Sequence, residues 1–149
     1  MSVGIDLGTS GCRVGVWEHS NVTPILNEWD ELSTPSFVRV EQNKHEIGSL
    51  AKAAANVNSK ITVFGLKHLL GAEYREPGTQ RLVQRWPFRV QEGAQGEPVI
   101  RIDPHVHSPE SLLALVLGRL RADVVKHGVE VCASLHCSHL MRDAWSLTR

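Results

Sequence analysis

The sequence is poor in cysteine and in aromatic residues, and it carries no excess of charge of either sign. Three cysteines among 149 residues fall at irregular spacing, which excludes a disulfide framework and favours a reducing, cytoplasmic environment. Sixteen basic residues balance sixteen acidic ones, so no net field attracts a polyanion or an anionic membrane surface. We therefore expect neither nucleic acid nor a membrane as a partner.

Long hydrophobic runs and internal repeats are also missing. The longest apolar stretch, around residues 112–120, is interrupted by Gly118 and Arg119 and is too short to span a bilayer. The N-terminus has no charged region followed by an apolar run, and the chain has no heptad array or low-complexity tract. A hydrophobic content of 42% nevertheless supports a packed core, so we expect one globular domain or part of one.

Short apolar and alternating segments predict an antiparallel β-meander at the start of the chain. The predicted strands are residues 3–7, 12–17, 22–26 and 37–40, with a glycine-bearing turn at 8–11. Helix-forming residues predict a short helix within 48–56 and a second one between 65 and 71. Residues 88–91 and 98–102 flank a polar, glycine-rich connection and predict a second hairpin.

The clearest element is a long helix from residue 108 to residue 127. Ser108 suits the N-cap, Pro109 the first helical position, and Gly128 the end of the helix. An apolar residue recurs every fourth position, which predicts that one stripe packs onto a sheet: Leu112, Val116, Leu120 and Val124. Alternating apolar residues then predict a strand at 129–135.

The first turn has the composition of a phosphate-binding loop. Gly8 and Gly11 allow close approach of the backbone to an anion, and the N–H groups of Thr9, Ser10 and Gly11 can form a concave nest. Asp6 ends what we expect to be a buried strand and faces the same space, where it suits a Mg²⁺ ion held through water. The alternative is an ordinary β-hairpin in which Asp6 caps the turn.

Several segments resemble known families. Residues 5–11 are similar to the first phosphate motif of the actin-like ATPase superfamily, which includes carbohydrate kinases and chaperones. Residues 33–38, 47–52, 62–71 and 86–90 resemble, in order and spacing, segments of the heat-shock protein 70 family. The resemblance covers residues 3–128 and favours this family over the carbohydrate kinases, which remain a remote alternative.

The resemblance implies a fold and a division of the chain. The fold is α/β, the first lobe of the actin-like ATPase (ribonuclease H-like) fold, incomplete, with an inserted smaller α/β subdomain. Residues 1–128 would form a partial nucleotide-binding domain with the insertion at about 36–104, and residues 129–149 a divergent tail. The implied function is that of an ATP-dependent chaperone that binds ATP or ADP with Mg²⁺ and acts on unfolded peptide clients with co-chaperones.

The resemblance also assigns roles to residues. Lys67 aligns with the lysine that reaches the γ-phosphate in this family, so Lys67 and Asp6 are the catalytic candidates. Gly8, Thr9, Ser10 and Gly11 are the nucleotide-binding candidates, with Thr9 and Ser10 aligned to the paired threonines of the family motif. Without the resemblance, Lys67 would be interpreted as a solvated surface lysine.

The chain departs from the family pattern at several places. Gly11 replaces a usual tyrosine and Ala72 a common arginine, and the match fades after Gly128. The second phosphate motif, the catalytic glutamate and the adenosine-binding segment do not occur in these 149 residues. We therefore expect an N-terminal fragment that does not complete the ATPase cycle alone, with a non-enzymatic, truncated interaction protein as the alternative.

Three other groups of residues are weaker candidates for a functional role. The tail residues Cys132, His136, Cys137 and His139 have the donor types of a zinc site, but without a Cys-x-x-Cys pair an unstructured or packed tail is favoured. His105 and His107 are expected in a surface loop. Trp29 and Trp86 are interpreted as packing residues rather than a stacking platform, because no basic groove accompanies them.

Overall fold

A computed structural model describes residues 2–41 and 44–129 and shows a mixed α/β fold with three small antiparallel sheets. The first sheet contains β1 (Ser2–Leu7), β2 (Gly11–Glu18), β3 (Asn21–Ile25) and the two-residue β4 (Thr34–Pro35). Its order is β1-β2-β3, and β4 pairs with the start of β2. The predicted hairpin is confirmed, with Leu7 opposite Cys12 across the turn, and so is the third strand.

The second sheet corrects the predicted meander. β5 (Phe37–Glu41) lies between β6 (Lys44–Ile47) and β7 (Thr62–Phe64), so the predicted strand at 37–40 belongs to this sheet and not to the first. The change of sheet follows from the start of β2 at Gly11. The Ser36 N–H still bonds to the Ser10 carbonyl oxygen in the same register, but the residues before Ser10 form the turn, and Phe37 pairs with Phe64 of β7 instead. The short helix α1 (Ser49–Ala54) follows β6, as predicted, and the 3₁₀ helix η1 (Ser59–Ile61) precedes β7.

The third sheet contains β8 (Arg89–Glu92), β9 (Pro98–Ile102) and β10 (His105–His107), in the order β10-β9-β8. The predicted hairpin is confirmed, but His105 and His107 lie in a strand and not in a loop, because β10 pairs with β9. The helix predicted between 65 and 71 is a four-residue 3₁₀ helix, η2 (Leu66–Leu69), and α2 (Pro77–Val83) was not predicted.

The long helix α3 (Pro109–Lys126) has the predicted caps. Ser108 is the N-cap, and its Oγ accepts a hydrogen bond from the Ser111 N–H at 3.1 Å. Gly128 ends the helix with a φ of 77°, a left-handed conformation that glycine adopts without steric cost. The strand predicted at 129–135 falls, after Val129, outside the described residues, as does the predicted tail, and the domain division stays a prediction.

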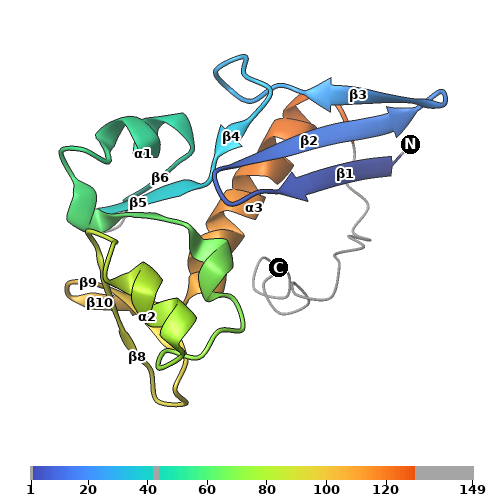
Figure 1. Cartoon of the computed structure of the whole chain (residues 1–149). Coiled ribbons are helices and arrows are strands. Elements are labelled where there is room, and N and C mark those ends of the chain that lie inside the picture. The colour runs from blue at the N-terminus through green and yellow to red at the C-terminus, as the bar shows by residue number, and fades with distance from the viewer. Residues whose placement is uncertain (1, 42–43, 130–149) are drawn as a thin grey trace.

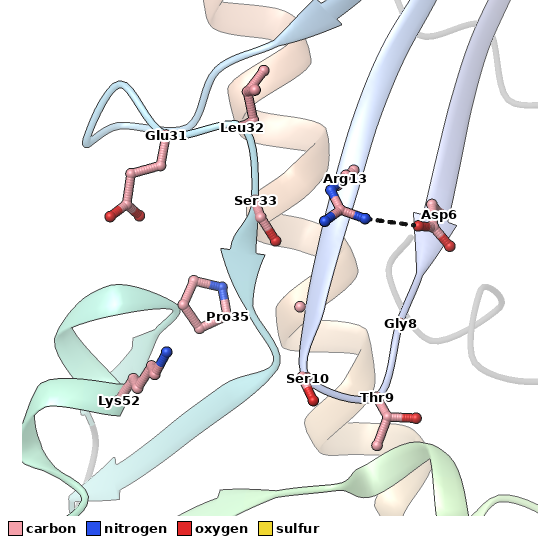
Figure 2. Close-up of a pocket in the computed structure, with 11 residues that line it drawn as sticks. Asp6, Gly8, Thr9, Ser10, Arg13, Glu31, Leu32, Ser33, Pro35 and Lys52 are labelled. Atoms are coloured by element: carbon pink, nitrogen blue, oxygen red, sulfur yellow. Dashed lines mark ion pairs between the residues drawn. The ribbon is translucent and has the colours of Figure 1, made fainter.

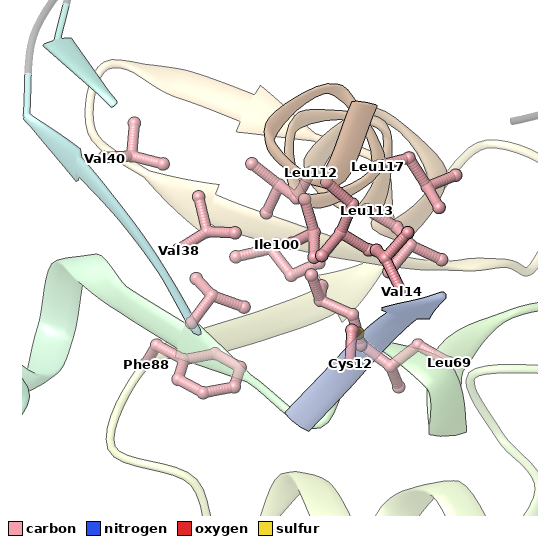
Figure 3. Packing of buried hydrophobic residues seen from close by; sticks show 14 of the residues in the cluster. Cys12, Val14, Val38, Val40, Leu69, Phe88, Ile100, Leu112, Leu113 and Leu117 are labelled. Atoms are coloured by element: carbon pink, nitrogen blue, oxygen red, sulfur yellow. The ribbon is translucent and has the colours of Figure 1, made fainter. Parts of the chain in front are cut away.

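Helix α3 joins the three sheets through one hydrophobic core. It runs across the molecule and contacts β2, β5, β6, β9 and η2 (Figure 1). In Figure 3, Val14 of β2, Val38 of β5 and Ile100 of β9 converge on Leu112 and Leu113 of the helix. The predicted stripe is confirmed, since Leu112, Val116, Leu120 and Val124 are all buried. The core therefore fixes the first hairpin relative to the segment that carries Lys67.

Candidate functional site

The turn between β1 and β2 forms one side of a cleft of about 650 Å³, a size that suits a small ligand. Figure 2 shows the hairpin on one side, the segment before β4 on another, and Lys52 of α1 at the edge. The lining residues are Asp6, Gly8, Thr9, Ser10, Gly11, Arg13, Glu31, Leu32, Ser33, Pro35 and Lys52. The cleft thus gathers five of the six predicted site residues, all except Lys67.

Both glycines of the turn are closely packed, and at Gly8 the packing requires a residue without a side chain. A Cβ on Gly8 would overlap the carbonyl oxygen of Gly11, which is backbone and has little freedom to move away. A Cβ on Gly11 would lie 2.6 Å from Ser33 Oγ, well inside van der Waals contact. The Ser33 side chain therefore occupies the space next to Gly11, at the position where the family usually has tyrosine.

Asp6 lies at the cleft, but in a more open strand than predicted. Alternate residues of β1 are exposed, which corrects the expected buried strand: in the described part of the chain β1 pairs only with β2. Its carboxylate pairs with Arg13 at 3.7 Å, and both side chains are about two-thirds exposed. Asp6 thus interacts with Arg13 rather than capping the turn. An exposed pair of this kind stabilises the fold by ~1 kcal/mol at most, so the carboxylate remains available to a ligand.

Lys67 lies beside the turn although it is not part of the cleft wall. Its Nζ donates a hydrogen bond to the Leu7 carbonyl oxygen at 3.0 Å, a contact between residues 60 positions apart in the sequence. Gly65 precedes η2 with a φ of 69°, and a Cβ there would meet Trp86 at 3.0 Å. This glycine lets the chain turn tightly against Trp86 and bring Lys67 to the end of β1.

Trp86 is a packing residue, as predicted, and Trp29 is not. Trp86 stacks on Phe88 with ring centroids 5.2 Å apart and meets Phe64 edge-on. Trp29 is 50% exposed, in the irregular segment between β3 and β4. The interpretation of Trp29 was wrong because the main-chain N–H of Trp29 bonds to the Asn27 side chain, which shapes a surface turn there.

Several residues of the cleft were not predicted from the sequence. Lys52 and Arg13 supply positive charge at its edges, and Glu31 accepts a hydrogen bond from Ser49 Oγ at 2.8 Å. That bond, followed by one from Asn27, lowers the pKa of Glu31. Lys52 belongs to a segment that resembles the family. The prediction of a helix there does not show that Lys52 lines the same cleft as the turn.

His105 and His107 of β10 lie near a third histidine, His45. The rings of His105 and His107 lie 6.3 Å apart, and burial, followed by the charges of His45 and His105, lowers the pKa of His107. Within residues 2–41 and 44–129 no group of three His, Cys, Asp or Glu side chains is arranged to hold a metal ion. The predicted zinc ligands of the tail lie outside the described residues. Among the described helices, none has the length and apolar content to cross a membrane.

A glycine-bearing turn, an adjacent carboxylate and a lysine held beside them define an α/β protein with a candidate phosphate site. A model of the Hsp70 protein family matches residues 2–132. The chain therefore belongs to the Hsp70 family, as the resemblance indicated, and this favours the chaperone alternative over the carbohydrate kinases.

Similar proteins occur in fungi, in Homo sapiens and in other eukaryotes such as Dictyostelium discoideum. A heat shock protein of Pyricularia oryzae and a ribosome-associated molecular chaperone of Saccharomyces cerevisiae are each 36% identical over 124 residues, or 80% of this chain. The putative heat shock 70 kDa protein 7 of Homo sapiens is 32% identical over 141 residues, 87% of this chain and 38% of its own length. The chain spans about a fifth of the length of the two fungal relatives.

Proposed function

We propose that the chain carries the first phosphate-binding part of an Hsp70-type ATP site, in the first lobe of an actin-like ATPase (ribonuclease H-like) fold. The observation that carries this proposal is the approach of Lys67 to the glycine turn, with Nζ 3.0 Å from the Leu7 carbonyl oxygen. An isolated lysine is usually a solvated surface residue. A lysine whose ammonium group is fixed beside a turn of small residues can neutralise charge on a phosphate bound there.

The residues fit a Mg²⁺-nucleotide. Gly8 and Gly11 line the cleft and carry no side chain, so phosphate oxygens can approach the backbone N–H groups of the turn closely. Asp6 offers an exposed carboxylate, which suits Mg²⁺ held through water. When bound, Mg²⁺ would neutralise phosphate charge. The ion pair between Arg13 and Asp6 would then break, or Asp6 would interact with both Arg13 and the hydrated ion. Lys67 would replace its hydrogen bond to the Leu7 carbonyl oxygen with one to a phosphate oxygen.

The wider role of the chain follows from its family. We propose a cytoplasmic chaperone function on unfolded peptide clients, together with co-chaperones, in which this chain contributes the first phosphate motif. Because the chain spans about a fifth of its fungal relatives, ATP hydrolysis would need the remaining motifs from elsewhere. The second candidate is a non-enzymatic interaction protein, which an inability to bind nucleotide would favour.

Calorimetric titration of the purified chain with ATP and ADP in the presence of Mg²⁺ tests the nucleotide site. We expect Asp6→Ala to weaken both nucleotides about tenfold, since a charged contact is lost, and Lys67→Ala to weaken ATP more than ADP. Asp103→Ala is the matched control for the first variant, because Asp103 also pairs with an arginine, Arg101, at 2.6 Å. Lys60→Ala is the control for the second, as an exposed lysine of another 3₁₀ helix.

Circular dichroism establishes that each variant is folded before it is titrated. Saturable binding that both control variants preserve would support the proposed site. A folded wild-type chain without saturable binding, or an Asp6→Ala variant that binds like Asp103→Ala, would contradict it and favour the interaction protein.

A further inference from the structure

Ser36 is hydrogen-bonded to two residues of the glycine turn, Gly8 and Ser10. The pairing of β2 with β4 extends one residue beyond Pro35, where the Ser36 N–H donates to the Ser10 carbonyl oxygen at 3.2 Å. The Ser36 hydroxyl donates to the Gly8 carbonyl oxygen at 2.8 Å. Ser36 is 6% exposed and does not line the cleft, so these bonds hold the turn from its buried side.

These two bonds orient two N–H groups of the turn. In a trans peptide unit the C=O and the following N–H point in opposite directions and lie in one rigid plane. Holding the Gly8 oxygen toward Ser36 therefore turns the Thr9 N–H away from Ser36, and holding the Ser10 oxygen does the same for the Gly11 N–H. Ser36 thus aims two of the three N–H groups expected to form the anion nest.

Cys12 completes the arrangement from the core side. Its Sγ lies 3.2 Å from Ser36 Oγ, and its side chain is fully buried. The single hydroxyl proton of Ser36 is used on Gly8, so in the Cys12–Ser36 contact the thiol is the donor; the Gly8 carbonyl oxygen is a second acceptor for the thiol, but at 4.0 Å it is the more distant one. Burial raises the pKa of Cys12, which keeps the thiol protonated and able to donate. The three groups form one directed chain from Cys12 through Ser36 to Gly8.

We propose that Ser36, oriented by Cys12, is a positioning residue that holds the phosphate loop in its binding conformation. The inference rests on the proposed nucleotide site and extends it to two residues outside the cleft wall. Loss of the Ser36 hydroxyl frees the Gly8 peptide unit to rotate, so the Thr9 N–H no longer points constantly toward a bound phosphate. Nucleotide binding weakens although every lining residue remains.

Ser36→Ala, compared with Thr62→Val, tests the proposal in the full chain. Thr62 is the matched control because its buried hydroxyl also donates to a carbonyl oxygen, that of Asn58 at 2.9 Å, away from the turn. Both variants should lower the unfolding midpoint by similar amounts. Only Ser36→Ala should weaken Mg²⁺-ADP about tenfold, the usual scale of one hydrogen bond, and accelerate hydrogen exchange at the position-36 amide.

Cys12→Ala and Cys12→Ser provide a second comparison, in which we expect smaller effects than in Ser36→Ala. Serine retains a donor to Ser36 and alanine does not, so Cys12→Ser should keep slower exchange at the position-36 amide than Cys12→Ala. Equal exchange and equal ADP affinity in Ser36→Ala and Thr62→Val would overturn the proposal. If the wild-type chain binds no nucleotide, the proposed function fails, and the exchange rates alone decide whether Ser36 holds the turn.

Discussion

Replacing Gly8 with alanine should abolish nucleotide binding and lower the free energy of unfolding by about 1–3 kcal/mol, the usual cost of overpacking a closed site. The cause is steric, since the new Cβ would overlap the Gly11 carbonyl oxygen, while Gly8 itself does not have a positive φ. Relief requires the turn to open, which moves the N–H groups of the nest. Urea unfolding and titration with Mg²⁺-ADP measure the two effects.

Gly78→Ala is the control for this prediction. Gly78 lies in α2, and a Cβ there meets no atom within 4 Å. Alanine is the better helix former by ~1 kcal/mol, so this variant should be neutral or slightly more stable, with unchanged binding. A Gly8→Ala chain as stable as Gly78→Ala would show that the turn tolerates a side chain and that its tight closure is not a requirement.

Replacing Leu112 with alanine should lower the free energy of unfolding by about 2–5 kcal/mol, the range for a large side chain removed from a packed core. Leu112 is 1% exposed and lies where α3 meets residues of all three sheets (Figure 3). The cavity cannot close without moving the helix against at least one sheet. Denaturant unfolding followed by circular dichroism measures the loss.

Leu50→Ala makes the same chemical change on a surface helix. Leu50 is 47% exposed in α1, so its removal should cost less than about 1 kcal/mol. Similar destabilisation by the two substitutions would mean that α3 does not join the sheets through a common core. If Leu112→Ala is destabilised but binds ADP with unchanged affinity, packing at Leu112 does not determine the conformation of the glycine turn.

The sequence predicted the elements with strong local signals. The first hairpin and the long helix follow from glycine at the turn, Ser108 and Pro109 at the helix start, and regular apolar spacing, all read over a few residues. The membership of strand 37–40 in a separate sheet could not be predicted. It depends on which distant strands, β6 and β7, supply hydrogen-bond partners once the first ladder reaches the turn before β2.

The candidate site divides in the same way. Asp6 and the turn at 8–11 were predicted because they are contiguous, and Lys67 because it matched a family segment. Lys52 and Ser36 were missed as site residues, because the segments that contain them, 47–52 and 33–38, served to recognise the family and assigned no role to either residue. Their importance comes from the cleft and from the carbonyl oxygens of Gly8 and Ser10.

By itself the sequence determined the chemistry available to this protein: a backbone able to approach phosphate, a carboxylate next to it, and a helix with one apolar stripe. Each is a property of neighbouring residues and is set by backbone angles, side-chain size and hydrogen-bonding groups. Only the tertiary structure decided that Lys67 reaches Leu7 and that Ser36 holds the turn. These contacts join residues far apart in the chain, and they form only when burial of the core around α3 outweighs the entropy lost in bringing the segments together.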